Sequence, residues 1–379
     1  MPGVKADPIE LLRARTSEKW VTYPDDVLPL FVAETDYPIA PVVAEAVIDR
    51  VRASDTGYVS DASPAARAFA GFAGRRWDWA LDPSLVRCTT DVSVAIVEVL
   101  RVLLEPGSRV AIMPPVYPPF FGLVPEAGHT TYEVPLVDRR IDLAGVEAAF
   151  VDGVKAVLLC HPHNPIGVPH PADDLRALAE LAREHGAFVV SDEIHGPLTH
   201  PDGHFVPFLD TCAAAREVGV CVTSASKGWN IAGFKCAMIV ADDPAVNARL
   251  DRMSEEVLWR TSILGMHASA AAFTHGAEWL DATIAAMVES RRLLTSLLAE
   301  HLPEVDYREP TASYLAWLDL RALADDPNPA ARILTDAKVA LTPGPDFGAP
   351  GVGHVRLNLA CSAEMLTAAV ERIATTYRS

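Results

Sequence analysis

Three polar side chains with complementary chemistry follow three apolar runs of the sequence. Asn164 comes after a run that ends at residue 160, Asp192 comes at the end of the next run, and Lys227 follows a third. Because ligands of open α/β sheets bind where the carboxyl ends of the strands open into loops, we expect an amide, a carboxylate and a lysine to meet at one pocket. Taken singly, a lysine after a strand is usually a solvated surface residue and an aspartate at a strand end is usually a turn former. The prediction therefore depends on the order of the three residues and on Ser224 and Ser226 beside the lysine.

An amide, a carboxylate and a lysine at one site meet the requirements of pyridoxal 5′-phosphate (PLP) chemistry. The aldehyde of PLP needs a lysine that is unprotonated part of the time, the pyridine nitrogen needs an anion that keeps it protonated, and the 3′-oxygen needs a hydrogen-bond donor. We assign these roles to Lys227, which would form a Schiff base, to Asp192 and to Asn164. The sequence thus predicts a PLP enzyme with an amino acid as substrate.

Short apolar runs alternate with segments of helical period from about residue 85 to 240. This alternation is typical of βα units and of a mainly parallel, doubly wound sheet in an α/β domain. Leu175, Leu178 and Leu181 recur at helical spacing and predict a helix between the second and third strands. The expected strands cover residues 109–113, 154–160, 187–191, 220–224 and 235–240.

A smaller α+β domain is expected after Trp279. A long helix-like segment leads there to predicted strands at residues 314–319, 338–342 and 355–359, which are separated by loops rich in proline and glycine. A chain of 379 residues is long enough for two domains. We predict an N-terminal arm at residues 1–37 that belongs to the small domain, a large cofactor-binding domain at residues 38–275, and the remainder of the small domain at residues 276–379.

Composition and charge restrict the compartment and the partners. The chain is 50% hydrophobic and 22% charged, as folded globular proteins are. Its formal net charge of −18 is spread along the chain and would repel a nucleic-acid backbone. The six cysteines form no CxxC pair and lie in apolar stretches, as reduced thiols do. The polar start of the chain and the charges within the apolar run 92–104 predict neither a signal peptide nor a membrane span, so we expect a cytoplasmic protein.

The order of the motifs resembles that of fold-type I PLP enzymes, the aspartate aminotransferase superfamily. Asn164-Pro165-x-Gly167 is followed by Asp192, then by Ser224-x-Ser226-Lys227, and finally by Arg356. Within this superfamily the chain is similar to the MalY/PatB group of cystathionine β-lyases. The segments that carry this similarity are residues 19–20, 31–38, 115–117, 191–195, 226–233, 314–317 and 356–361.

The resemblance implies further site residues. Tyr117 would stack on the pyridine ring and take part in catalysis, whereas the alternative is a tyrosine of the core. Arg356, with Asn164 beside it, would bind the α-carboxylate of the substrate, and a structural ion pair is the competing explanation. Tyr58 matches a tyrosine that reaches the phosphate of the neighbouring subunit, which implies a homodimer with shared active sites.

The cofactor phosphate would be bound by hydroxyl groups, by the N-terminus of a helix and by one lysine. Lys235 would pair with the phosphate as a point charge, unless it is merely a solvated surface lysine. The other expected phosphate ligands are Ser224, Ser226 and the backbone N–H groups of Val92 and Ser93.

Asp91 departs from the pattern of the family, which usually has glycine at this position. Its carboxylate can cap the helix that follows, but its proximity to the phosphate should weaken cofactor binding. No metal site is expected, because the histidines at positions 195, 200 and 204 do not share a helix face with a carboxylate.

Two reactions use all of these residues. In a carbon–sulfur β-lyase, Lys227 removes the α-proton and a thiolate then leaves from Cβ, so cystathionine or a cysteine S-conjugate gives thiol, pyruvate and ammonia. In an aminotransferase the proton returns to the cofactor and a keto acid departs. His195, which we count among the cofactor-binding residues, favours the lyase, because aminotransferases commonly have a tyrosine there to bond the 3′-oxygen. A regulatory binding protein on the same scaffold is a third hypothesis, which the presence of the lysine, aspartate, asparagine and arginine disfavours.

Overall fold

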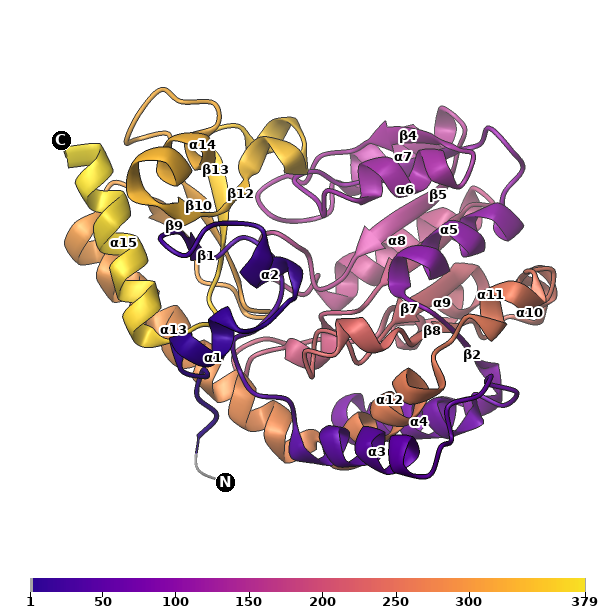
Figure 1. The fold of residues 1–379 in the computed structure, drawn as a ribbon. Coiled ribbons are helices and arrows are strands. Elements are labelled where there is room, and N and C mark those ends of the chain that lie inside the picture. Colours follow the sequence, from indigo (N-terminus) through magenta and orange to yellow (C-terminus); the bar gives the residue numbers. More distant parts are fainter. Residues whose placement is uncertain (1–2, 379) are drawn as a thin grey trace.

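A seven-stranded sheet forms the centre of the larger part of the molecule (Figure 1). The computed structural model describes residues 3–378, so residues 1, 2 and 379 of the predicted arm and small domain lie outside the described residues. In the strand order β2-β8-β7-β6-β5-β3-β4, β8 is antiparallel to both of its neighbours and the other pairs are parallel. The predicted α/β class with a mainly parallel sheet is confirmed. The strands are β2 (Val86–Thr89), β3 (Arg109–Ile112), β4 (Thr130–Glu133), β5 (Val154–Cys160), β6 (Phe188–Asp192), β7 (Gly219–Thr223) and β8 (Ala237–Val240).

Helices cover both faces of this sheet, which explains why its central strands are continuously apolar. All five residues of β7 are buried, and so are all residues of β5 except Lys155. On one face pack α5 (Val92–Leu103), α6 (Phe120–Glu126) and α10 (Pro244–Leu250). On the other face pack α7 (Leu143–Val151), α8 (Ala172–Glu184) and α9 (Ala213–Val218). The helix predicted from the leucine spacing is α8, and it buries Leu175 and Leu178.

A layer of helices lies below the large sheet in Figure 1. There α12 (Ile263–His275) packs against both α3 (Pro41–Arg52) and α4 (Ser63–Trp77). The short helix α11 (Glu255–Trp259) connects this layer to β2. These helices surround a cluster of aromatic side chains in which Phe72 contacts both Trp229 and Phe273.

A second sheet of four antiparallel strands has the order β12-β13-β10-β9. It is covered by α13 (Ala277–His301) and α15 (Ala363–Arg378), which pack against each other. The short helix α14 (Pro329–Arg332) and one π-helical turn at Ile333–Ala337 precede its β12. The strands are β9 (Asp306–Tyr307), β10 (Leu315–Asp319), β12 (Thr342–Pro343) and β13 (His354–Asn358).

The single strand predicted at residues 338–342 is wrong. The segment forms two short strands, because β11 (Val339–Ala340) pairs in parallel with β1 (Leu28–Pro29), whereas β12 pairs with β13. Neighbouring parts of one apolar run therefore pair with two different strands, β1 and β13.

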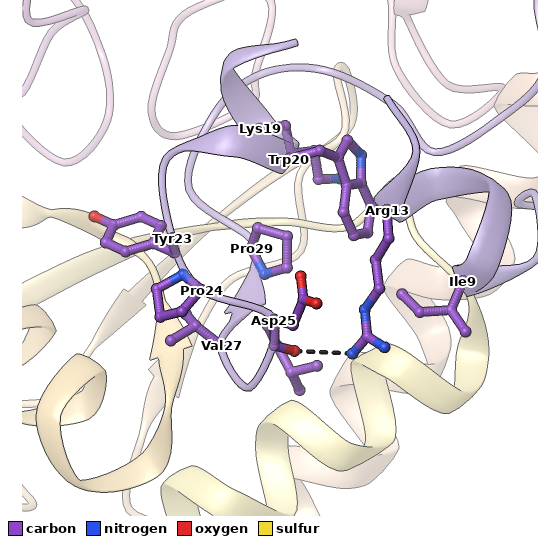
Figure 2. Close-up of a pocket in the computed structure, with 10 residues that line it drawn as sticks. Ile9, Arg13, Lys19, Trp20, Tyr23, Pro24, Asp25, Val27 and Pro29 are labelled. Atoms are coloured by element: carbon purple, nitrogen blue, oxygen red, sulfur yellow. Dashed lines mark hydrogen bonds between the residues drawn. The ribbon is translucent and has the colours of Figure 1, made fainter. Parts of the chain in front are cut away.

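The N-terminal arm crosses the second sheet before it enters the helical layer. Its short helices are α1 (Ile9–Arg13) and α2 (Glu18–Val21). In Figure 2 the side chain of Arg13 reaches back to the backbone oxygen of Asp25, at 2.8 Å from Nη2. The hollow shown there has a volume of about 20 Å³, which is room for about one water molecule. The arm is therefore packed on itself.

Buried polar contacts fix the arm to the rest of the molecule. The side chains of Lys19 and Asp36 are fully buried and form an ion pair of 2.7 Å. Asn358, on β13, donates from Nδ2 to the backbone oxygens of Val32 at 2.7 Å and Glu34 at 2.6 Å. Residues 32–34 are consequently held in one position beside the sheet.

The described residues contain no helix with the length and apolar character that crossing a bilayer requires. The six cysteines form no disulfide, and five of them are buried while Cys212 is partly exposed.

Candidate active site

The carboxyl edge of the large sheet opens into a cavity of about 440 Å³. Its walls come from the strand ends of the large sheet, from the start of α5, from β13 and from the N-terminal arm. The structure brings most of the predicted site residues together here. Those that line the cavity are Val92, Ser93, Tyr117, Asn164, Asp192, His195, Ser226, Lys227, Lys235 and Arg356.

Lys227 follows β7 and is half-buried in the cavity wall. Its Nζ donates to the backbone oxygen of Ala33 at 2.9 Å. Burial and, to a lesser extent, the charge of Arg356 lower the pKa of Lys227 to about 8, although the carboxylates of Glu34 and Asp192 act in the opposite direction. A substantial fraction of this amine is therefore neutral near physiological pH, which is the form that attacks a carbonyl carbon.

Asp192 ends β6 and is buried without an ion-pair partner among the described residues. Burial raises the pKa of its carboxyl group to about 7, against the opposing effects of the Ile194 N–H, which donates to Oδ1 at 3.2 Å, and of the Lys227 charge. A cationic ring nitrogen placed beside this carboxylate would favour its ionised form.

Arg356 projects from β13 into the cavity and is buried. It donates from Nη1 to Oδ1 of Asn164 at 3.1 Å, and from Nη2 to the backbone oxygen of Phe31 at 2.9 Å and to Oγ1 of Thr342 at 3.1 Å. Its Nε has no hydrogen-bond partner in the described part of the chain. The face of Phe347 lies 5.2 Å from the guanidinium. Burial lowers the pKa of Arg356 to about 10, so it remains a cation at neutral pH.

No carboxylate of the described residues pairs with Arg356, so the structural ion pair considered as an alternative is not formed by residues 3–378. A buried cation without an anion is costly, and a ligand carboxylate would satisfy it. The bond to Arg356 also fixes the amide of Asn164, because its oxygen is the acceptor and Nδ2 is left as a donor.

Tyr117 lies in the loop after β3, with its ring at the cavity wall rather than in the core. The ring meets Phe120 edge to face, with 5.7 Å between centroids. Burial, together with the charge of Asp192, raises the pKa of Tyr117 to about 12. The neutral ring is thus available for stacking against a flat ligand.

His195 is buried in the cavity wall and is neutral. Burial lowers its pKa to about 3, and the charges of Lys227 and Arg356 act in the same direction. Its Nδ1 has no hydrogen-bond partner within the described residues. The ring lies 6.3 Å from that of Tyr314, whose hydroxyl donates to Ala33.

The helix N-terminus predicted for the phosphate is the start of α5. Asp91 accepts from the backbone N–H of Val94 at 2.9 Å, so the predicted capping role is confirmed. Its other carboxylate oxygen lies 3.2 Å from Nζ of Lys235. The first N–H groups of a helix lack intrahelical acceptors, and those of Val92 and Ser93 are at this wall.

Two predicted residues do not line the cavity. Ser224 is buried behind it, where Oγ donates to the backbone oxygen of Cys236 at 2.7 Å and accepts from the N–H of Ser226 at 3.1 Å. Ser224 therefore orients Ser226, which does line the cavity. Tyr58 is 92% exposed and does not line the cavity of its own chain.

Several residues of the cavity wall were given no role in the sequence analysis. The most prominent are Glu18 and Glu34, two carboxylates that the N-terminal arm contributes. The signal for Glu34 was its position in the segment 31–38, where a carboxylate interrupts apolar residues. The others are Val32, Ala33, Cys160, Ile194 and Ala232.

The donor set fits PLP as predicted. A helix N-terminus with a serine and a lysine suits the phosphate, and an unpaired buried carboxylate suits the pyridine nitrogen. A lysine with a lowered pKa suits the aldehyde, and an arginine without an anion suits the substrate carboxylate.

Comparisons with known proteins agree with this arrangement. The model of the family "Aminotransferase class I and II" matches residues 25–373. A Mycobacterium leprae protein with the provisional name cystathionine β-lyase is 43% identical over 388 residues, which cover 96% of each chain. Cystathionine β-lyase PatB of Bacillus subtilis is 32% identical over 359 residues and 92% of each chain. A solved structure from Corynebacterium diphtheriae, provisionally described as a PLP-dependent β-cystathionase, has a TM-score of 0.95 at 33% identity and covers 100% of both chains.

Proposed function

Because the chain belongs to the class I and II aminotransferase family, and within it to the MalY/PatB group, we propose that it is a PLP-dependent carbon–sulfur β-lyase. The substrate would be cystathionine or another cysteine S-conjugate, and the products would be a thiol, pyruvate and ammonia. One observation carries the proposal: Lys227, Asp192 and Arg356 surround one cavity, Asp192 and Arg356 are buried and Lys227 is half-buried, and none of the three has an ion-pair partner among residues 3–378.

The residues of the cavity divide into a cofactor set and a substrate set. Lys227 would bind the cofactor aldehyde covalently, Asp192 would face the pyridine nitrogen and Tyr117 would stack on the ring. When bound, PLP supplies an electron sink that makes the α-proton of the substrate acidic. The phosphate would lie at the start of α5, between Ser226 and Lys235.

The substrate is held by its α-carboxylate and loses its α-proton to the chain. Arg356 would bind the carboxylate through the guanidinium edge that has no other anion, and its bond to Asn164 keeps that edge in place. Lys227, once its amine is free, accepts the α-proton, which its lowered pKa allows near neutral pH. The bond between Cβ and sulfur then breaks, and the thiolate leaves with the bonding electron pair. Water finally replaces nitrogen at the former α-carbon, which gives pyruvate and ammonia.

His195 favours the lyase over the aminotransferase. It lies in the cavity wall as a neutral imidazole at the place where aminotransferases, by the family pattern, have a phenol for the 3′-oxygen. Which reaction follows depends on whether the thiolate leaves Cβ before the α-proton is returned. A difference of about 3 kcal/mol between the barriers of the two competing reactions would make one of them about a hundredfold faster than the other.

A homodimer in the cytoplasm is part of the proposal. Tyr58 is 92% exposed, and the helix before it, α3, exposes Ile48 at 45% and Val51 at 54%. A second copy of the chain would cover such apolar residues and would bring Tyr58 to its own phosphate site. The unpaired cysteines suit a reducing compartment.

The test is incubation of the holoenzyme with L-cystathionine in the absence of any keto acid. We expect sustained release of pyruvate, ammonia and thiol in equal amounts. An enzyme that stops after one turnover, and resumes only when a keto acid is added, would be an aminotransferase, and the lyase proposal would be wrong.

A further inference from the structure

Two carboxylates of the active-site cavity take no part in the reaction described above. Glu18 stands at the start of α2 and Glu34 lies between β1 and α3, and both line the cavity. Neither side chain forms a hydrogen bond or an ion pair with another residue of the described chain. Glu18 is exposed and Glu34 is half-buried. The arm thus presents two unpaired negative charges to the site.

The other charges of the cavity already have partners in the proposed reaction. Arg356 takes the α-carboxylate, Lys227 takes the cofactor aldehyde, and Lys235 is paired with Asp91 at the phosphate end. Of these cations, only Lys227 has its pKa raised by the charges of both Glu34 and Glu18, and Lys227 forms no ion pair with either of them. A second cation, on the substrate, could therefore still pair with these carboxylates.

Glu34 lies close to the reacting groups and is held there rigidly. The residue before it, Ala33, accepts the hydrogen bond from Nζ of Lys227 at 2.9 Å. The backbone oxygen of Glu34 accepts from Asn358 at 2.6 Å, and the next residue, Thr35, exchanges two hydrogen bonds of 3.0 Å with the side chain of Asn230. A side chain on so well fixed a backbone can recognise a charge at a defined distance from Lys227.

We propose that Glu34, assisted by Glu18, forms a subsite for a positively charged group on the sulfur side of the substrate. The distal ammonium of cystathionine is one such group, and a primary amine two carbons from the sulfur is another. A carboxylate binds an ammonium through a charge-assisted hydrogen bond, and Val32 and Ala33 beside it offer an apolar wall for the connecting methylenes. This inference deepens the proposed function and rests on it.

The test compares two substrates that differ in one charge. S-(2-aminoethyl)-L-cysteine carries a distal ammonium, and S-(2-hydroxyethyl)-L-cysteine carries a neutral group of the same length. In Glu34→Gln holoenzyme, kcat/KM for the aminoethyl compound should fall roughly tenfold, mainly through KM, while that for the hydroxyethyl compound should change less than about twofold. Glu18→Gln should act in the same direction but more weakly, since its exposed charge is screened by solvent. Glu304→Gln, on the exposed surface away from the cavity, is the control for net charge.

An equal loss for both substrates would overturn the proposal, because Glu34 would then act on the common α-amino group or on the structure. The failure of the proposed function is distinguished by a binding measurement. Calorimetry on Lys227→Ala protein supplied with PLP measures the affinity of both compounds without turnover. If the wild-type enzyme releases no pyruvate from either compound, the lyase proposal fails, and the calorimetric ratio alone decides the subsite. Equal affinities of the two compounds, with or without Glu34, would refute it.

Discussion

Lys227 has the environment of a nucleophile rather than of a surface lysine. Its side chain is half-buried and its one hydrogen bond is to a backbone oxygen. Burial, with a smaller contribution from the charge of Arg356, lowers its pKa to about 8. Because the pKa of this amine is lowered, little free energy is needed to remove its proton before it forms a covalent bond to carbon. Labelling and replacing Lys227 is therefore the most direct test of the site.

Borohydride should attach the cofactor irreversibly to Lys227. Peptide mapping after reduction is expected to find the pyridoxyl group on this residue, and Lys227→Ala should lower turnover by at least roughly a thousandfold, because the covalent anchor and the proton acceptor are both lost. Lys155→Ala, at the exposed position of β5, is the matched control. A label on another lysine, or none, would remove Lys227 from its assigned role.

Asp192 should matter for chemistry and its neighbour Glu193 for stability. Asp192→Asn keeps the shape of the side chain but cannot hold a proton on the pyridine nitrogen, so we expect turnover to fall by roughly a hundredfold or more. Glu193 is equally buried, yet its Oε1 accepts from Ser191 Oγ at 2.9 Å and from the Phe208 N–H at 2.8 Å. Glu193→Gln retains an acceptor for both bonds and should change the melting temperature more than the turnover. Similar losses of turnover in both variants would contradict a chemical role for Asp192 and a structural role for Glu193.

At the scale of elements, the segment between β5 and α8 is held together by three buried histidines. His161 bonds to the backbone oxygen of Val206 at 3.0 Å, His163 to that of Pro115 at 2.7 Å and His170 to that of Cys160 at 3.2 Å. Asn164 lies within this segment, so its position depends on these bonds. Burial lowers the pKa of His161 and of His163 to about 4, and that of His170 well below its usual value.

Acid should therefore unfold the protein in part through these histidines. Their pKa values in the folded state lie below the unfolded value of 6.5, so the unfolded chain binds more protons, and stability is lost as the pH falls from about 6.5 towards 4. Each histidine contributes a slope on the order of 1 kcal/mol per pH unit. His163→Gln keeps an N–H donor for Pro115 and should reduce this slope. Urea unfolding of cofactor-free protein at several pH values measures it, and identical slopes in variant and wild type would contradict the prediction.

The start of α5 combines a helix cap with an ion pair. Asp91 caps the helix through Val94 and pairs with Lys235, whose charge it partly withholds from a phosphate. Asp91→Asn preserves the cap and removes the charge, so we expect PLP to bind several times more tightly. Asp91→Gly removes both the helix cap and the negative charge, so comparing the two variants separates the effect of the cap on PLP affinity from that of the charge. Fluorescence titration of cofactor-free protein gives the affinities. Weaker binding by the Asn variant would mean that the ion pair positions Lys235.

The central strands could be predicted because burial on both faces makes them continuously apolar, as in β5. The edge strand β4 escaped prediction, since its residues are exposed or half-exposed and include two threonines and a glutamate. The site was predictable where its chemistry follows a strand directly. The position of Glu34 in the cavity wall could not be predicted, because it depends on contacts between residues far apart in the sequence. One of these is the hydrogen bond from Asn358 to the backbone oxygen of Glu34.

At the scale of the whole molecule, the active site lies where two sheets meet. Asp192 ends β6 of the large sheet, Lys227 follows β7, and Arg356 lies on β13 of the small sheet. Figure 1 shows the two sheets as separate parts of the ribbon. The 3.1 Å bond between Arg356 and Asn164 joins the small sheet to the loop that follows β5 of the large sheet. The separation of the substrate carboxylate from the proton acceptor is therefore set by how the sheets pack, and the arm that crosses between them fixes it further.

The exposure of Tyr58 leads to the last prediction, which concerns two chains. If Tyr58 serves the neighbouring phosphate site, Tyr58→Ala homodimers should bind PLP more weakly, and Lys227→Ala homodimers should be inactive. Random exchange of equal amounts would make half of the dimers mixed, and each mixed dimer would contain one site with both native residues. At a PLP concentration that saturates only wild-type sites, the mixture should recover about a quarter of the wild-type activity. Sedimentation should show a dimer throughout. A monomer in sedimentation, or a mixture no more active than the mean of its two parents, would show that Tyr58 acts within its own chain or not at all.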